Sequence, residues 1–281
     1  MTPELRFVPF LGPHGFHRLA YWEWAGPGAR AVICAHGLTR NGRDFDRLAA
    51  ALSETCRVAC PDFPGRGRSE WLEHPEDYAY PTYLAAAAAL IARLGVERVD
   101  WVGTSMGGLV GMMLASLPGS PVRRLVLNDV GPVVPAQALK RIGSYVGTDP
   151  RFRSLEDLEA YLREIHAPFG PLPDEDWAHL ARHGSRKLPD GTWALAYDPK
   201  IGEPFRALSR EDVDLWEVWD RVQCPVLVLR GETSDVLLPA TADEMARRGP
   251  RARVVTIPGT GHAPALTDPA HVRLVRDWLA G

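Results

Sequence analysis

The stretch Gly103-Thr104-Ser105-Met106-Gly107-Gly108 joins a short apolar run, Val99 to Val102, to a second apolar run that is typical of a helix. A serine between strand and helix, with glycines two residues before and after it, is typical of a sharp turn that has no room for Cβ atoms. Such a turn lifts the serine hydroxyl clear of the sheet. We therefore predict that Ser105 is a nucleophile, and that the Met106 N–H at the helix start binds an oxyanion.

A carboxylate and a histidine follow Ser105 in the order Ser, Asp, His. The run Val226 to Gly231 predicts a buried strand, and Asp235 lies just past its end. His262 lies in a turn-rich loop after another short strand, Ala252 to Ile257. We predict that His262 is the base that takes the Ser105 proton, and that Asp235 is the carboxylate that orients this histidine.

Four segments resemble the α/β-hydrolase superfamily, and more narrowly its bacterial esterase-like members with a helical cap. They are the strand and His-Gly loop from Val32 to Leu38, the turn from Asp62 to Ser69, the Ser105 turn, and the loops of Asp235 and His262. The resemblance implies an α/β-hydrolase fold with a mostly parallel eight-stranded sheet and helices on both faces. It also implies that the Leu38 N–H is the second oxyanion donor, with His36 orienting the loop.

One spacing departs from the resemblance, because three residues instead of two lie between Gly231 and Asp235. The spacing from Asp235 to Pro239 is the usual one, so Asp235 remains the predicted acid. Asp129 is the alternative, since it ends the strand that follows the Ser105 helix and some members of the superfamily carry the acid there. If Asp235 is the acid, we expect Asp129 to anchor a loop.

The rhythm of strands and helices stops between Gly131 and about Asp212. Helix-like segments near Pro135 to Val146, Ser154 to His166 and Asp174 to Gly184 are separated by prolines. We predict that residues 131–212 form a helical cap, inserted into a core of residues 1–130 and 213–281. Aromatic residues here are expected either to line an apolar acyl pocket or to pack cap on core: Phe152, Tyr161, Phe169, Trp177, Trp193, Tyr197, Phe205, Trp216 and Trp219.

The composition is that of an ordinary globular protein, with 281 residues, 46% of them hydrophobic and 24% charged, and a formal net charge of -3. Arginines are scattered among acids, so neither nucleic acid nor an anionic membrane is an expected partner. No apolar run approaches the roughly 20 residues of a membrane helix, and the start does not resemble a secretion signal. We expect a cytoplasmic monomer or homodimer.

No metal ion or cofactor is predicted. The cysteines show no paired spacing and are expected to be buried, reduced thiols: Cys34, Cys56, Cys60 and Cys224. The remaining histidines show no acidic or thiol partner at ligand spacing, so surface or capping roles are expected: His14, His17, His74, His166, His179, His183 and His271.

These patterns predict a serine hydrolase that cleaves carboxylic esters of small to medium apolar acyl groups through an acyl-enzyme. The fold also hosts lactonases and carbon-carbon bond hydrolases, which are alternatives for a small-molecule substrate. A hydrolase-like ligand receptor with slow turnover is an alternative from another class. Arg40 or Arg43, after the His-Gly loop, would bind a substrate carboxylate if it faced the pocket, but a salt bridge to Asp44 or Asp46 is the simpler interpretation.

Overall fold

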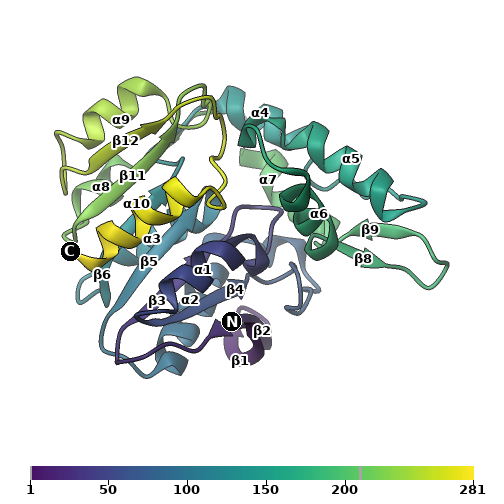
Figure 1. Ribbon diagram of the computed structural model, residues 1–281, viewed down its shortest axis with the longest axis horizontal. Helices are drawn as coiled ribbons and strands as arrows, with labels where there is room; N and C mark the ends of the chain where they lie inside the picture. The colour runs from purple at the N-terminus through teal and green to yellow at the C-terminus, as the bar shows by residue number, and fades with distance from the viewer. Residues whose placement is uncertain (1, 209–210) are drawn as a thin grey trace.

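An eight-stranded sheet forms the centre of the computed structural model, which describes residues 2–208 and 211–281 (Figure 1). The strand order is β1-β2-β4-β3-β5-β6-β11-β12. The β1–β2 and β2–β4 pairs are antiparallel and the other pairs are parallel. The strands are β1 Glu4–Gly12, β2 Gly15–Trp24, β3 Ala31–Ala35, β4 Arg57–Asp62, β5 Val99–Thr104, β6 Val122–Asn128, β11 Val226–Gly231 and β12 Arg253–Ile257. The predicted α/β-hydrolase fold is thereby confirmed.

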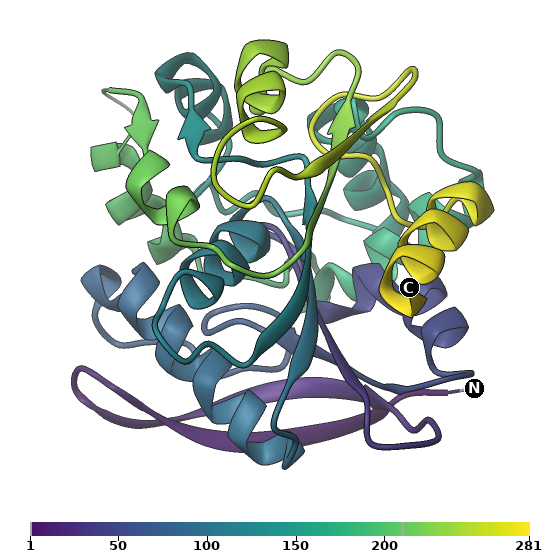
Figure 2. The same cartoon turned by 90° about the vertical axis from the view of Figure 1, so that its left-hand side faces the viewer.

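Helices cover both faces of the sheet (Figure 2). One face carries α1 (Asp46–Leu52) and α10 (Pro269–Ala280), and the other carries α2 (Tyr80–Leu94), α3 (Met106–Ala115), α8 (Trp216–Asp220) and α9 (Pro239–Met245). Successive strand residues point to opposite faces. Ile33 and Leu125 therefore belong to the apolar cluster under α2 and α3, whereas Val32 and Val126 belong to the cluster under α1 and α10.

Local signals explain where several helices begin and end. α2 has Pro81 in its first turn and ends at Gly95, whose φ of 64° is left-handed. α10 begins after Asp268, whose side chain accepts a hydrogen bond from the Ala270 N–H at 2.6 Å. Short 3-10 helices complete the connections: η1 Gly42–Phe45, η2 Pro75–Asp77, η3 Ala167–Phe169 and η4 Pro199–Ile201.

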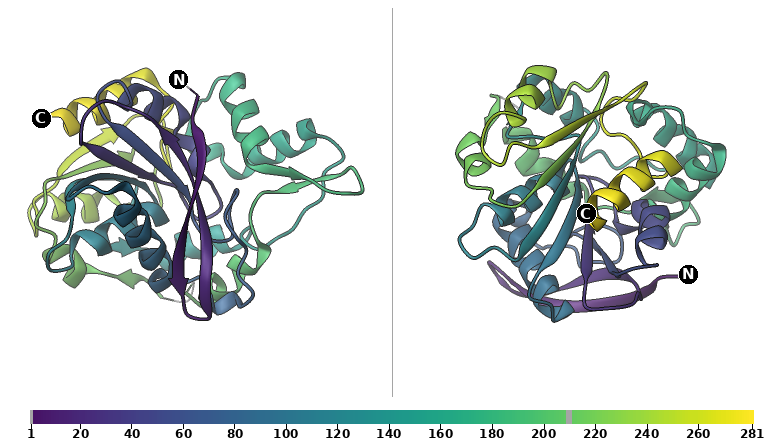
Figure 3. Two further views of the ribbon diagram at one scale, coloured as in Figure 1. Left: turned by 90° about the horizontal axis from the view of Figure 1, so that it is seen from below. Right: turned by 60° about the vertical axis from the view of Figure 1, so that its left-hand side comes forward.

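Between β6 and β11 the chain leaves the sheet and forms a separate lobe, residues 133–208 and 211–214, which we call the cap (Figures 1 and 3). It contains β7 Val133–Val134, α4 Ala136–Gly143, α5 Leu155–Ile165, α6 Asp174–His183, β8 Ser185–Lys187, β9 Trp193–Leu195, α7 Gly202–Leu208 and β10 Val213–Asp214. β7 pairs with β10, so the cap departs and returns at one place. Its three predicted helices are present as α4, α5 and α6, whereas α7 and the short strands were not predicted. The domain boundaries at 131 and 212 stay a prediction.

The turn at Ser105 is a place of backbone-to-backbone packing. A Cβ atom on Gly103 would lie 2.3 Å from the Gly107 carbonyl oxygen, and one on Gly107 would lie 2.2 Å from the Ala35 carbonyl oxygen. The end of β5, the start of α3 and the end of β3 therefore approach as closely as only glycine permits. Trp101 fixes the same point from beneath, because its Nε1–H donates to the Gly107 oxygen at 2.9 Å.

We expect Gly103→Ala to lower the free energy of unfolding by about 1–3 kcal/mol, the usual cost of overpacking, because the new Cβ meets backbone that cannot turn aside. Urea denaturation measures the loss. Gly143→Ala is the matched control, since a Cβ there lies 3.5 Å from Phe205 at ordinary contact distance, and its stability should not fall. Equal losses in the two variants would contradict this account.

Candidate active site

Ser105 adopts an unusual backbone conformation, with φ of 51° and ψ of -118°. Its N–H donates to the Asn128 oxygen of β6 at 3.0 Å, and its C=O accepts from the N–H groups of Gly108 and Leu109 at 2.8 and 3.0 Å. A positive φ in a residue other than glycine persists only where surrounding contacts hold it. Bonds on both sides of Ser105 supply that restraint, so the predicted sharp turn is present.

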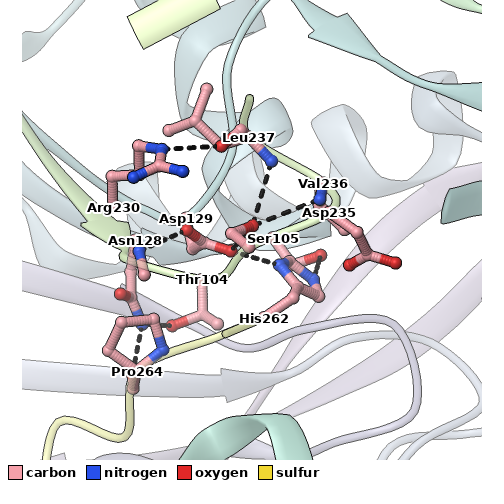
Figure 4. Close-up of polar contacts among 12 residues, drawn as sticks. Thr104, Ser105, Asn128, Asp129, Arg230, Asp235, Val236, Leu237, His262 and Pro264 are labelled. Carbon is pink, nitrogen blue, oxygen red and sulfur yellow. Dashed lines mark hydrogen bonds and ion pairs between the residues drawn. The ribbon is translucent and has the colours of Figure 1, made fainter. Parts of the chain in front are cut away.

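Three side chains form a hydrogen-bonded chain at the carboxyl ends of the strands (Figure 4). His262 Nε2 lies 2.9 Å from Ser105 Oγ, and His262 Nδ1 lies 2.8 Å from Asp129 Oδ2. The Asp129 side chain is fully buried, and that of His262 is 10% exposed. Ser105 comes from the start of α3, Asp129 follows β6, and His262 follows β12. The arrangement is that of a nucleophile, a base and an orienting acid, and we call Ser105, His262 and Asp129 the triad.

The prediction that Asp235 contacts His262 is wrong. The Asp235 carboxylate instead makes a two-pronged pair with Arg141 of α4, with Nε–Oδ2 and Nη2–Oδ1 distances of 2.6 and 2.8 Å. Burial raises the pKa of this carboxyl, but the hydrogen bond and charge of Arg141 outweigh burial and lower the pKa below its ordinary value. Asp129, the alternative in the sequence analysis, occupies the position beside His262.

Ser234 explains why Asp129, and not Asp235, contacts His262. The sequence analysis assigned no role to this serine. Its hydroxyl donates to Asp129 Oδ2 at 2.6 Å and accepts from the N–H groups of Val236 and Leu237 at 3.1 Å. The Gly231 N–H donates to Asp129 Oδ1 at 2.7 Å. With one extra residue in the loop, a serine faces the buried acid and Asp235 turns toward the cap. The extra residue itself was the available signal.

The His-Gly loop lies against the Ser105 turn, since a Cβ on Gly37 would be 3.7 Å from the Ser105 Cβ. The Gly37 oxygen accepts from His36 Nδ1 at 2.7 Å and from the Arg40 N–H at 3.1 Å. In a trans peptide the N–H points opposite to the C=O, so these two bonds direct the Leu38 N–H away from His36. This agrees with an orienting role for His36, while the oxyanion roles of Leu38 and Met106 stay a prediction.

Arg66 supports the same loop, a role that the sequence analysis did not assign. Its fully buried side chain donates from Nε to the Leu38 oxygen at 2.8 Å and from Nη1 to the Tyr83 hydroxyl at 2.9 Å. Its Nη2 lies 3.6 Å from Met106 Sδ. One side chain therefore contacts both residues proposed as oxyanion donors. The sequence analysis treated Asp62 to Ser69 only as a turn, and so did not predict that Arg66 contacts the loop of Leu38.

A small cavity of about 50 Å³ lies beside the triad, lined in part by His36, Thr104, Phe169 and Leu180. Phe169 is thus one of the predicted aromatics at the pocket, whereas Trp177, Tyr197 and Trp219 are buried in the core. A larger depression of about 700 Å³ lies at the opposite ends of the strands, around Arg98, Ser120 and Pro225. It therefore lies away from Ser105, Asp129 and His262, which are at the carboxyl ends of the strands.

Arg40 and Arg43 form the predicted salt bridges. Arg40 pairs with Asp44 at 2.8 Å and Arg43 pairs with Asp46 at 2.5 Å. Arg40 also lines the cavity beside the triad, although its guanidinium is committed to Asp44.

The expectation that the histidines lack acidic partners is wrong for His14, which lies 2.8 Å from Asp77 Oδ2, and for His179 and His183. The latter two lie four residues apart on α6, and one ligand atom from each lies within 4.8 Å of Asp46 at the start of α1. The i,i+4 spacing could have shown that the two histidines share a helix face. Two histidines and a carboxylate are ligand types that zinc accepts. Arg43 already serves as counter-ion to Asp46, and the absence of a resident metal stays a prediction.

Comparison with known proteins agrees with this geometry. The model of the alpha/beta hydrolase family matches residues 32–272. The chain belongs to this family. It is 47% identical to a 3-hydroxybutyrate-oligomer hydrolase of Cupriavidus necator, over 100% of this chain and 99% of that protein. It is 27% identical to an esterase of Mycobacterium tuberculosis, over 92% and 85% of the two chains. The chain is therefore a hydrolase, and these two relatives are a hydrolase and an esterase by name.

Solved structures show the same relationship. An alpha/beta hydrolase from Novosphingobium aromaticivorans superposes with a TM-score of 0.89 at 37% identity, covering 99% of this chain and 98% of that one. A structure from Rickettsia typhi superposes with a TM-score of 0.92 at 32% identity, covering 100% and 99%. Within the part of the hydrolase that the structure describes, no helix is long and apolar enough to span a membrane.

We expect Asp129→Asn to lower kcat on a neutral p-nitrophenyl ester by about 10⁴-fold, the loss typical when an amide replaces the acid of a triad. The amide no longer holds the histidine tautomer that accepts the Ser105 proton. Asp235→Asn is the matched control and should stay within about tenfold of wild type on the same ester. The reverse ranking, in variants that remain folded, would return the acid role to Asp235.

Stability should depend on pH through His36. Burial, with smaller contributions from Arg66 and Arg40, lowers the pKa of its imidazole to about 3, against about 6.5 when unfolded. The unfolded chain therefore binds the extra proton first, so this stabilisation is full above pH 6.5 and is lost as pH falls toward 3. The slope is at most about 1.4 kcal/mol per pH unit.

Urea denaturation between pH 7 and pH 4.5 measures this effect. His36→Gln replaces the ring by an amide that can still donate and accept but does not titrate, so its slope should be shallower than that of wild type. Burial and the charge of Arg43 also lower the pKa of His183 to about 3. The variant keeps His183, so part of the pH dependence should remain. Parallel slopes would show that His36 does not contribute.

Proposed function

We propose that this enzyme hydrolyses the ester bonds of short 3-hydroxybutyrate oligomers through an acyl-enzyme on Ser105. The observation that carries the chemistry is the chain of contacts from Ser105 Oγ through His262 to Asp129. The full-length relative with 47% identity supports the substrate. These oligomers are esters with small acyl groups, as predicted from the sequence, but each acyl group carries an oxygen substituent and is less apolar than predicted.

In the first half-reaction, Ser105 Oγ attacks the ester carbonyl carbon while His262 Nε2 takes the hydroxyl proton. The carbonyl oxygen becomes an oxyanion that accepts from the Leu38 and Met106 N–H groups. Collapse of this intermediate breaks the bond to the leaving oxygen, which takes the proton from His262. An alcohol departs and the acyl group remains on Ser105.

In the second half-reaction, water attacks the acyl-enzyme and His262 takes its proton. The same oxyanion donors act again, and His262 returns the proton to Ser105 Oγ as the acid departs. Asp129 accepts from His262 Nδ1–H throughout and stabilises the imidazolium without becoming protonated. These steps use only side chains, backbone N–H groups and water.

Lactonase, carbon-carbon bond hydrolase and slow ligand receptor remain the other candidates. A lactonase breaks the same bond type in a ring, and a carbon-carbon bond hydrolase must protonate a carbon leaving group. A receptor would keep the triad but turn over slowly. We place the enzyme in the cytoplasm as a monomer or homodimer.

We expect purified enzyme to cleave the 3-hydroxybutyrate dimer and trimer to monomer many times per second, as measured by chromatography of the acids. Ser105→Ala should lose at least about 10⁴-fold in rate and should no longer react with a fluorophosphonate. Ser116→Ala is the control and should remain active, since the Ser116 hydroxyl only donates to the Met113 oxygen at the end of α3. Labelled wild type that cleaves no oligomer, but cleaves a lactone or a carbon-carbon substrate, would refute the proposed substrate.

A further inference from the structure

The Arg141–Asp235 pair joins the cap to the catalytic core close to His262. Arg141 lies on α4, and Asp235 follows Ser234, the residue that holds the triad acid. Both side chains are partly exposed, at 36% and 43%. Ion pairs with such exposure contribute little to stability. The pair places a guanidinium at the edge of the site, with Nε and Nη2 facing Asp235 and Nη1 outside that pair.

Two further polar side chains gather at this edge. Tyr145 follows α4, and burial raises the pKa of its hydroxyl while the neighbouring Arg141 acts in the opposite direction. The tyrosine therefore stays a neutral donor beside the guanidinium. The His166 ring lies edge-on to Tyr145, with ring centres 6.4 Å apart.

His166 is a buried ring without a hydrogen-bond partner among the described residues, although it is only 5% exposed. It stacks on Phe169, with ring centres 4.6 Å apart, and Phe169 lines the cavity beside the triad. Burial lowers the pKa of His166 well below its ordinary value, and the charges of Arg40, His262 and Arg141 act in the same direction. The imidazole of His166 is thus held neutral, in contact with Phe169 on one side and with Tyr145 on another.

This set of donors matches a carboxylate. A guanidinium binds a planar carboxylate with paired N–H groups, and hydroxyl and imidazole donors add single bonds to its oxygens. A neutral imidazole whose ring nitrogens make no hydrogen bond within the described residues can donate to a ligand. On the proposed function, each oligomer carries one free carboxylate, at the acid end of the chain. We propose that Arg141, with Tyr145 and His166, forms a cap subsite that binds this free carboxylate.

Asp235 has a defined role in this subsite. In the absence of substrate it balances the charge of Arg141 and fixes the plane of the guanidinium. When the substrate carboxylate arrives, Asp235 repels it as a like charge. Arg141 therefore strengthens binding of the acid and Asp235 weakens it, so removal of each should have the opposite effect.

The test compares the dimer and trimer of 3-hydroxybutyrate with their methyl esters, which lack the negative charge. In Arg141→Gln we expect KM for the free acids to rise by about 10- to 100-fold, the range for loss of a charged hydrogen bond, while KM for the methyl esters and kcat change little. In Asp235→Asn we expect KM for the free acids to fall. Arg151→Gln, which removes an exposed cap arginine paired with Asp149, should leave both substrates unaffected.

The outcomes separate this subsite from the proposed function. If wild type cleaves acids and methyl esters with equal KM, or if Arg141→Gln weakens both equally, the subsite is refuted while the oligomer hydrolase stands. If wild type cleaves neither acids nor methyl esters, the proposed function itself fails. A purely structural role of Arg141 cannot change the ratio of acid to methyl-ester KM, so this ratio decides.

Discussion

A completely buried negative charge is the constraint on which the site depends. Removing a carboxylate from water costs several kcal/mol unless donors replace the lost solvent, and Asp129 is met by the Gly231 N–H, the Ser234 hydroxyl and His262. Gly231 ends β11, Ser234 and His262 follow β11 and β12, and Asp129 follows β6. Satisfying one charge therefore fixes three strand ends relative to one another. The position of the imidazole beside Ser105 follows from that restraint.

The sequence identified those features that local sterics determine. Glycines on both sides of Ser105 indicate that backbone segments approach closely there. The apolar runs of β5 and β11 indicate strands that are buried on both faces. The choice between Asp129 and Asp235 was not local, because both carboxylates follow a strand end. One extra loop residue decided it by placing the Ser234 hydroxyl against Asp129. Hydrogen bonding across 105 positions in sequence has no local pattern.

The cap shows the same limit. Prolines and helix-like periodicity located α4, α5 and α6, but not the partners that these helices meet. Asp46, the first residue of α1, lies beside His179 only because α6 of the cap packs against this part of the core. Likewise, the Gly261 N–H donates to the Pro168 oxygen at 2.7 Å, which ties the loop of His262 to the cap. Such contacts depend on how two lobes sit together, and no single segment encodes them.

The cavity beside the triad has a consequence for how substrate is admitted. About 50 Å³ holds no more than one or two water molecules at roughly 30 Å³ each, whereas small-molecule sites usually span about 300–1,000 Å³. This cavity alone therefore does not hold an oligomer, and a substrate carbonyl that reaches the partly exposed Ser105 needs further space beside the cap. Any conformational change that supplies this space consumes part of the intrinsic affinity, so the apparent dissociation constant exceeds the intrinsic one by the inverse of the binding-competent fraction.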